Sequence, residues 1–330
     1  MSQANWHGKP YYSLDAWCKN TLKRKCYKVA LNAHMTCPNR DGTLGSRGCI
    51  FCSAGGSGDF AVSFQQSCPT TGDSTRLQLR EGIQLISSKL RKEPSPTDSA
   101  LPCIIAYFQS YTNTYAPVGY LEKIYTSALE APEVCGISIA TRPDCLPDET
   151  IALLISLQEK YPDKFIWIEL GLQTIHPMTA AYIRRGYPLS CFETAVRKLT
   201  MAKLPIIVHV ILGLPGETNQ DMLETISYLN QFSLFGMKLQ LLHVLKGTDL
   251  ARDYEAGSFE TLSMESYLDI LIQCMEHLSP ETVIHRVTGD GPKELLISPL
   301  WSADKRNVLN TLHARMRERG VCQGDKYTAP

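Results

Sequence analysis

The feature that most constrains the fold is a regular alternation of strand-like and helix-like segments. Short stretches rich in apolar, β-branched or aromatic residues recur six times, and five longer segments with helical spacing separate them. The strand-like stretches are residues 27–32, 103–108, 135–140, 165–170, 206–211 and 236–242, and the helical segments are 76–91, 117–130, 147–160, 177–201 and 218–232. Alternation of this kind predicts a parallel sheet with crossover helices.

Six strand units are fewer than the eight that close a TIM barrel. We therefore predict an α/β fold, a partial (β/α)6 TIM-like barrel with N-terminal and C-terminal extensions. A doubly wound open sheet fits the same periodicity and stays open as an alternative. In both folds the loops after the C-terminal ends of the strands carry the chemistry.

The pattern suggests three regions. Residues 1–26 hold several aromatic and basic side chains and read as an N-terminal extension. Residues 27–260 hold the strand–helix units of the barrel core, and residues 261–330 read as a C-terminal helical extension that closes the barrel. We expect helices at 263–278 and at 302–319 within that last region.

Composition limits the classes of partner and the use of the cysteines. Lys plus Arg and Asp plus Glu both number 33, so the chain has no net charge that would attract nucleic acid as a whole, although local basic patches can do so. No apolar stretch approaches the roughly 20 residues of a membrane helix, and we find no secretory signal, so we expect a cytoplasmic protein without membrane contact. The 12 cysteines are then no disulfide framework, and most are expected to be small buried residues, such as Cys274.

Three cysteines lie together in a glycine-rich segment after the first predicted strand. Cys37, Cys49 and Cys52 have the spacing C-x11-C-x2-C, which suits one metal centre. Three thiolates on a [4Fe–4S] cluster leave one iron open to a ligand. A structural zinc site takes four closed ligands, and His34 could complete a Cys3His set. Both interpretations stay open on spacing alone.

The segment CPNRDGT, followed by GCIFC and GSGDF, resembles the cluster loop of the radical S-adenosylmethionine superfamily. The usual spacing in that family is C-x3-C-x2-C with an aromatic before the last cysteine, a place held here by Phe51. The longer first arm resembles that of the elongator-protein-3-like branch, in particular a bacterial subgroup, and the resemblance runs over roughly residues 10–325. It implies that Cys37, Cys49 and Cys52 hold a [4Fe–4S] cluster and that Phe51 lies beside the cofactor. It further implies an external one-electron reductant and reductive cleavage of S-adenosylmethionine to a 5′-deoxyadenosyl radical.

The ends of the second and third strands supply candidate cofactor contacts. Gln109, Ser110 and Tyr111 stand where the family binds the methionine amino group, although its usual Gly-Gly-Glu is absent; Tyr111 is also a candidate for substrate contact. Thr141 and Arg142 follow the third strand, where an arginine can pair with a carboxylate such as the methionine tail. A polar turn and a strand-end salt bridge are the structural alternatives.

The fourth strand ends with Glu169 and Gln173, which we expect to point into the barrel mouth, with Gln173 toward the cofactor. A buried glutamate is rare unless it is paired. Arg142 or Lys238 is the expected partner, and Glu169 is a candidate catalytic or substrate residue.

The fifth and sixth strands lead into two further candidate loops. Gly213 and Glu217 lie in a turn that resembles the family's adenine-binding turn, although a glycine-rich turn before a helix is ordinary by itself. Lys238 and His243 have a spacing that could face the barrel interior, as catalytic or substrate residues. A satisfied core histidine is the alternative for His243.

Relatives in the elongator-protein-3-like branch modify wobble uridines of tRNA, and the subgroup is similar to enzymes that convert 5-carboxymethylaminomethyl-2-thiouridine toward the 5-aminomethyl form. Lys23, Arg24 and Lys25, and Arg315 in the basic 302–319 helix, are candidate phosphate contacts. Solvated charged faces are the alternative. A radical enzyme for a small metabolite or a tetrapyrrole, and a non-catalytic zinc-stapled module, are the competing functions.

The other cysteines, among them Cys18, Cys26, Cys103 and Cys135, are scattered without paired spacing. We therefore expect no second cluster.

Overall fold

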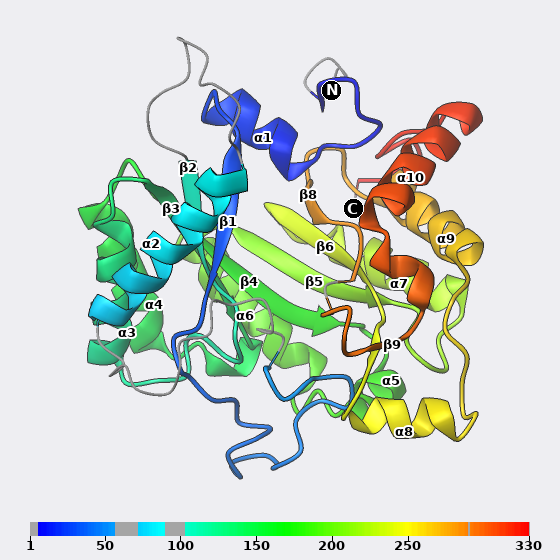
Figure 1. Cartoon of the computed structure of the whole chain (residues 1–330), viewed down its shortest axis with the longest axis horizontal. Coiled ribbons are helices and arrows are strands. Elements are labelled where there is room, and N and C mark those ends of the chain that lie inside the picture. The colour runs from blue at the N-terminus through cyan, green and yellow to red at the C-terminus, as the bar shows by residue number, and fades with distance from the viewer. Residues whose placement is uncertain (1–5, 57–71, 90–102, 290, 330) are drawn as a thin grey trace.

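The computed structural model describes residues 6–56, 72–89, 103–289 and 291–329, and a curled parallel sheet of seven strands runs through them (Figure 1). The strands are neighbours in the order β1-β2-β3-β4-β5-β6-β8. They are β1 (Cys26–Leu31), β2 (Cys103–Phe108), β3 (Val134–Thr141), β4 (Phe165–Gln173), β5 (Ile206–Leu212), β6 (Gly236–Leu241) and β8 (Val283–Arg286). The strand order follows the chain without a reversal, so the sheet lacks the switch point of a doubly wound fold.

Helices cover the outer face of the sheet (Figure 1). They are α2 (Gly72–Lys89), α3 (Val118–Leu129), α4 (Asp148–Lys160), α6 (Leu189–Met201), α7 (Asn219–Leu229) and α9 (Met264–His277). The remaining elements are α1 (Leu14–Thr21), α5 (Pro177–Tyr182), α8 (Asp249–Glu255) and α10 (Lys305–Arg319), the short antiparallel pair β7 (Val244–Leu245) and β9 (Leu296–Ser298), and the 3₁₀ turns η2 (Pro143–Cys145) and η3 (Leu300–Ala303). None of the helices in the described part of the chain is long and apolar enough to cross a membrane.

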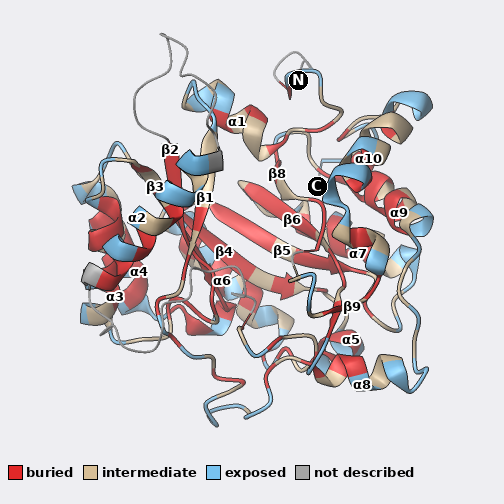
Figure 2. Ribbon diagram, in the orientation of Figure 1, coloured by how far each residue is buried: buried red, intermediate tan, exposed pale blue. Residues whose placement is uncertain are grey.

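Most residues of the strands are buried, as Figure 2 shows, and alternate residues pack in different clusters on the two sides of the sheet. Ile104, Ala106 and Phe108 of β2 belong to the large core beneath the outer helices. Ile105 belongs to a smaller interior cluster with Trp167 and Ile207, against which Trp17 of α1 packs. Burial on both faces explains why the strands read as continuous apolar runs.

The partial barrel predicted from the sequence is confirmed, with two differences in detail. The sheet has a seventh strand, β8, whose four residues are too short to show a period. The single helix expected over 177–201 is wrong, because the chain leaves the helix after α5 and resumes at α6. Gly186, with a φ of 84°, and Pro188 explain the break, since neither conformation continues a helix.

Candidate functional site

A cavity of about 220 Å³ lies at the C-terminal ends of the strands, where the cysteine segment folds against the sheet. Most of the side chains singled out in the sequence line it together: Cys37, Cys49, Phe51, Cys52, Gln109, Tyr111, Thr141, Arg142, Glu169, Gln173 and His243. Ser110, Gly213, Glu217 and Lys238 are not part of the lining. Residues more than 200 positions apart in the chain therefore meet at one place.

The cysteine segment is folded by its own backbone and by two polar side chains. The amide of Cys52 donates to the carbonyl of Cys49 at 3.0 Å, which closes a tight turn. Both cysteines line the cavity. Asn39 donates from its side chain to the Cys49 sulfur at 3.4 Å, and Arg40 donates to the carbonyls of Cys52 and Ser53 at 2.9 and 2.6 Å. The continuation of the motif, residues 57–71, lies outside the described part of the chain.

The electrostatic setting of Cys49 calls for a positive ligand. Burial, reinforced by the Cys52 thiol nearby, raises the pKa of Cys49 to about 12, so its thiolate is unfavourable in the bare protein. A bound metal centre reverses this preference, because thiolates are the form that ligates metal. His34 is exposed and does not line the cavity, so the structure does not gather it with the three cysteines.

Arg142 is held rigidly at the cavity wall. Its guanidinium donates twice to Asp144, at 2.9 and 2.7 Å, and once to the carbonyl of Arg185 at 3.0 Å. The ring of Tyr187 stacks 5.1 Å from it. This is the strand-end salt bridge that the sequence left as an alternative, and it fixes a positive charge within electrostatic reach of Cys49.

Backbone irregularities mark the edges of the cavity. The pairing of β4 with β5 shifts register between Gly171 and Gln173, a bulge at the end of β4. Gln173 and Tyr111 both adopt a positive φ, 66° and 60°, which is uncommon for residues with side chains. Such strained positions concentrate at functional sites.

Glu169 lies at the centre of a buried polar network on the floor of the cavity. Its side chain is fully buried and accepts from Ser138 at 2.6 Å, from Lys28 at 3.1 Å and from His209 at 2.7 Å, and it is ion-paired with Lys238. Burial opposes the charge, but Lys238 and Lys28 hold the pKa of Glu169 well below its usual range. The expected pairing with Lys238 is therefore found, whereas Arg142 pairs with Asp144.

Several cavity residues were missed in the sequence. Tyr107, Arg185 and His209 also line the cavity. His209 could have been found, since strand alternation places it on the same side of β5 as Ile207 and Ile211. Arg185 was assigned to a helix, and the Gly-Tyr-Pro that follows it is the signal for the turn.

The residues outside the lining have other surroundings. Ser110 is buried, and its hydroxyl has no hydrogen-bond partner among the described residues. Gly213 has a φ of 84°, and its amide donates to the Met222 sulfur at 3.2 Å. Glu217 is half-buried near Thr174 and Thr179, one of its carboxylate oxygens has no hydrogen-bond partner among the described residues, and burial raises its pKa.

The predicted phosphate contacts lie away from the cavity. Lys23, Arg24 and Lys25 directly precede β1 and so lie at the opposite end of the sheet from the cavity (Figure 1). Arg315 binds Asp269 of α9 at 3.3 Å. Lys28, within β1, points into the interior toward Glu169.

Comparison with known proteins gives consistent results. Residues 99–229 match the Radical SAM superfamily and residues 235–318 match the Radical_SAM C-terminal domain. The chain is 40% identical to the uncharacterized protein YtqA of Bacillus subtilis, covering 96% of this chain and 92% of that protein. It is 32% identical to the protein YhcC of Escherichia coli, with 93% and 92% covered.

More distant similarity reaches Elongator complex protein 3. The Drosophila melanogaster protein is 24% identical over 91% of this chain, which spans 57% of that relative. The solved structure of Methanocaldococcus infernus Elp3 with an N-terminal deletion superposes with a TM-score of 0.62 at 16% identity, covering 90% of this chain and 64% of the other. This superposition shows a shared fold. The chain belongs to the radical S-adenosylmethionine superfamily, in the branch that includes Elongator complex protein 3.

Proposed function

We propose that this radical S-adenosylmethionine enzyme modifies the side chain of a wobble uridine in tRNA, taking 5-carboxymethylaminomethyl-2-thiouridine toward the 5-aminomethyl form. Its cofactors are those of the superfamily, a [4Fe–4S] cluster and S-adenosylmethionine. In this proposal Cys37, Cys49 and Cys52 hold the cluster. The observation that carries the proposal is one cavity that is lined both by these three cysteines and by polar side chains from the strand ends.

The donor set fits a cluster better than a single metal ion. Three cysteines leave one iron of a [4Fe–4S] cluster open, which is the place for a chelating cofactor. Thiolates on one zinc ion lie less than about 4.6 Å apart, since each zinc–sulfur bond is about 2.3 Å. Among the described residues, the groups of ligand atoms that all lie within 4.8 Å of one another do not include Cys37, Cys49 and Cys52.

The chain's own residues prepare this site. When bound, the cluster supplies the electron for reductive cleavage of S-adenosylmethionine. Arg142 holds a fixed positive charge that favours the thiolate form of Cys49. Gln109, Thr141 and Gln173 offer hydrogen bonds from three neighbouring strand ends, which suits the polar groups of the cofactor.

A basic rim beside the cavity supports a polyanionic substrate. Arg47, next to the lining residue Gly48, binds Asp249 at 2.5 Å, and Arg184 and Arg252 bind the same carboxylate. The side chains of Arg47 and Arg252 are 63% and 76% exposed. Three arginines around one aspartate leave net positive charge, which attracts phosphate. We infer that this rim, rather than Lys23–Lys25, contacts the anticodon loop.

The direct test is nucleoside mass spectrometry of tRNA from cells with and without the gene. We expect loss of the gene to raise the carboxymethylaminomethyl-type nucleoside and lower the aminomethyl type. A version with Cys49→Ala should fail to restore the pattern. Unchanged wobble nucleosides would overturn the tRNA proposal and would favour a small metabolite or a tetrapyrrole as substrate.

A binding experiment tests the rim separately. Arg47→Gln with Arg252→Gln should weaken tRNA binding and lower the slope of log K against log salt by about 1–2, because each phosphate contact contributes about 0.7–0.9. The matched control replaces two exposed cations at the other end of the sheet, Lys23 and Lys25, by glutamine. Equal loss in the control would refute the assignment of the rim.

A further inference from the structure

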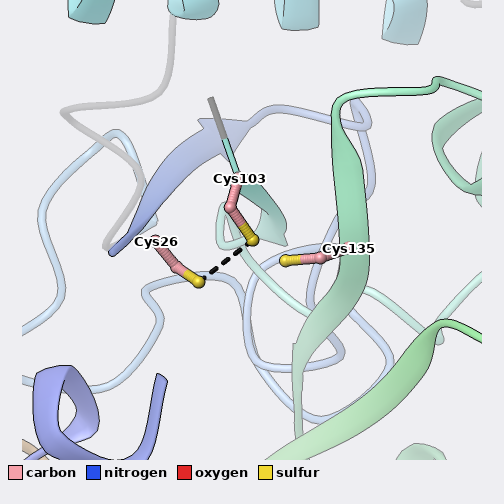
Figure 3. Close-up of side chains that lie close together, drawn as sticks. All are labelled: Cys26, Cys103 and Cys135. Atoms are coloured by element: carbon pink, nitrogen blue, oxygen red, sulfur yellow. Dashed lines mark hydrogen bonds between the residues drawn. The ribbon is translucent and has the colours of Figure 1, made fainter. Parts of the chain in front are cut away.

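Four cysteines that are scattered along the sequence gather at the end of the sheet opposite the cavity. Cys26 begins β1 and Cys103 begins β2, and the two residues are register partners whose sulfurs lie 3.0 Å apart. With Cys135 of β3 they form a group whose sulfur atoms all lie within 4.8 Å of one another. Figure 3 shows the three thiols, from three adjacent strands, pointing toward one another. This grouping could not be predicted from the sequence, since the three strand cysteines are far apart in the chain and no C-x2-C pair is present among the four.

A β-bulge aims the third thiol. Ser138 of β3 faces the barrel interior, where it bonds Glu169, whereas Ile137 and Ile139 pack on the outer side beneath the helices. Regular alternation would put Cys135 on that outer side with the isoleucines. The register shifts here, because Ile104 pairs with Val134 and Ile105 pairs with Gly136, which leaves Cys135 as the extra residue.

The bulge thereby brings Cys135 to the interior side, where it packs with Cys26 against the cluster of Ile105, Trp167 and Ile207. Bulges that re-aim one side chain are typically designed features of a fold.

The fourth thiol comes from outside the sheet. Cys18 of α1 is 1% exposed, and its thiol lies within electrostatic reach of Cys26 and Cys103. Its sulfur is not one of the three that all lie within 4.8 Å of one another. Trp17, the residue before it, contacts Trp167 edge-on with ring centroids 5.1 Å apart, which fixes α1 over this end of the barrel. α1 thus places a fourth sulfur near the three from the strands, and a closed four-sulfur site requires the Cys18 side chain to move toward them.

We propose that Cys18, Cys26, Cys103 and Cys135 bind one thiophilic metal ion, zinc, as a closed tetrathiolate site. Sulfurs on one zinc ion lie less than about 4.6 Å apart, close to the spacing of the three strand cysteines, and four ligands close a structural zinc site. Soft thiolates select zinc over magnesium or calcium. Arg24 and Lys164 lie within electrostatic reach of Cys26 and Cys135 and offset part of the negative charge. The ion joins α1 to the first three strands and is separate from the cavity.

The test uses the full-length chain with Cys37, Cys49 and Cys52 replaced by alanine, so that cluster iron does not obscure the metal count. Expressed and purified without chelators, this variant should contain about one zinc per chain. After removal of zinc, Co²⁺ should restore one ion per chain with the charge-transfer and intense visible bands of tetrahedral thiolate coordination. Adding Cys103→Ser should abolish or shift the thiolate bands. The matched control is Cys274→Ser, at a buried cysteine of α9, which should leave them unchanged.

X-ray absorption at the zinc edge of the otherwise unaltered protein covers the case in which a variant does not fold. Four sulfur neighbours at about 2.3 Å are expected in addition to the iron signal. Zinc well below one per chain, a zinc shell of oxygen and nitrogen, or cobalt bands that survive Cys103→Ser would overturn the proposal. A Cys26–Cys103 disulfide in anaerobically purified protein, detected by mass spectrometry after alkylation, would overturn it as well.

Discussion

Replacing Glu169 by glutamine removes the charge at the centre of the buried network. Glu169 is fully buried and Lys238 is 1% exposed, and burial already lowers the pKa of Lys238 well below its usual range. In the variant Lys238 loses the carboxylate that favours its charged form and keeps only the Tyr107 hydroxyl, at 2.8 Å, among these partners. Removing one partner of a buried ion pair costs about 3–5 kcal/mol, because the other charge stays desolvated. We expect a loss of this size in the free energy of unfolding of Glu169→Gln at pH 7, measured by urea denaturation of the cluster-free protein.

The pH dependence follows from the same pairing. The pKa of Glu169 in the folded protein is held below the value of about 4.3 in an unfolded chain. The stabilisation is therefore complete above about pH 4.3 and is lost as the pH falls through the folded pKa. Since glutamine does not titrate, the difference in the free energy of unfolding between the wild-type protein and Glu169→Gln should become smaller in acid.

Two controls define what would refute this reasoning. Asp148→Asn removes an exposed carboxylate, 87% exposed and 2.6 Å from Lys198, and should cost less than about 1 kcal/mol. Adding Lys238→Met to Glu169→Gln should recover part of the loss, because an apolar replacement of a buried pair is often neutral. A loss below about 1 kcal/mol for Glu169→Gln alone would show that the network is not structural. Glu169 would then be better interpreted as a substrate contact.

Three further perturbations test local features. Burial lowers the pKa of His209 to about 4, so NMR titration of its ring should give a midpoint near that value. Because the unfolded chain takes up the proton first, the free energy of unfolding should fall as the pH drops from about 6.5 toward 4. His209→Gln should make the free energy of unfolding less dependent on pH in this range. Thr218→Ala removes the capping box that Thr218 forms with Asp221 at the start of α7 and should cost about 1 kcal/mol by urea denaturation, with Thr218→Ser close to wild type. Gly56 has a φ of 62°, and Gly56→Ala would place a methyl group against the Tyr111 ring. We expect this variant to retain less iron after reconstitution. Adding Tyr111→Ala to Gly56→Ala should restore part of the lost iron.

The sequence by itself determined the features that depend on local spacing. Apolar runs and helical periods located six strands of the sheet to within a few residues, because a buried parallel strand has a composition of its own. The cysteine segment could be recognised because Cys37, Cys49 and Cys52 are close in the chain. The strand ends that line the cavity followed from the rule that parallel strands end at one edge.

Only the tertiary structure decided which distant residues meet. The choice of Lys238 as partner of Glu169, with His209 beside them, depends on the register of β4, β5 and β6, which periodicity does not encode. The cluster of cysteines opposite the cavity depends on one β-bulge in β3, since a shift of a single residue moves Cys135 from the outer face of the sheet to the interior. Alternation describes neighbours along one strand, whereas contact across strands is set by pairing, and pairing exists only in the folded sheet.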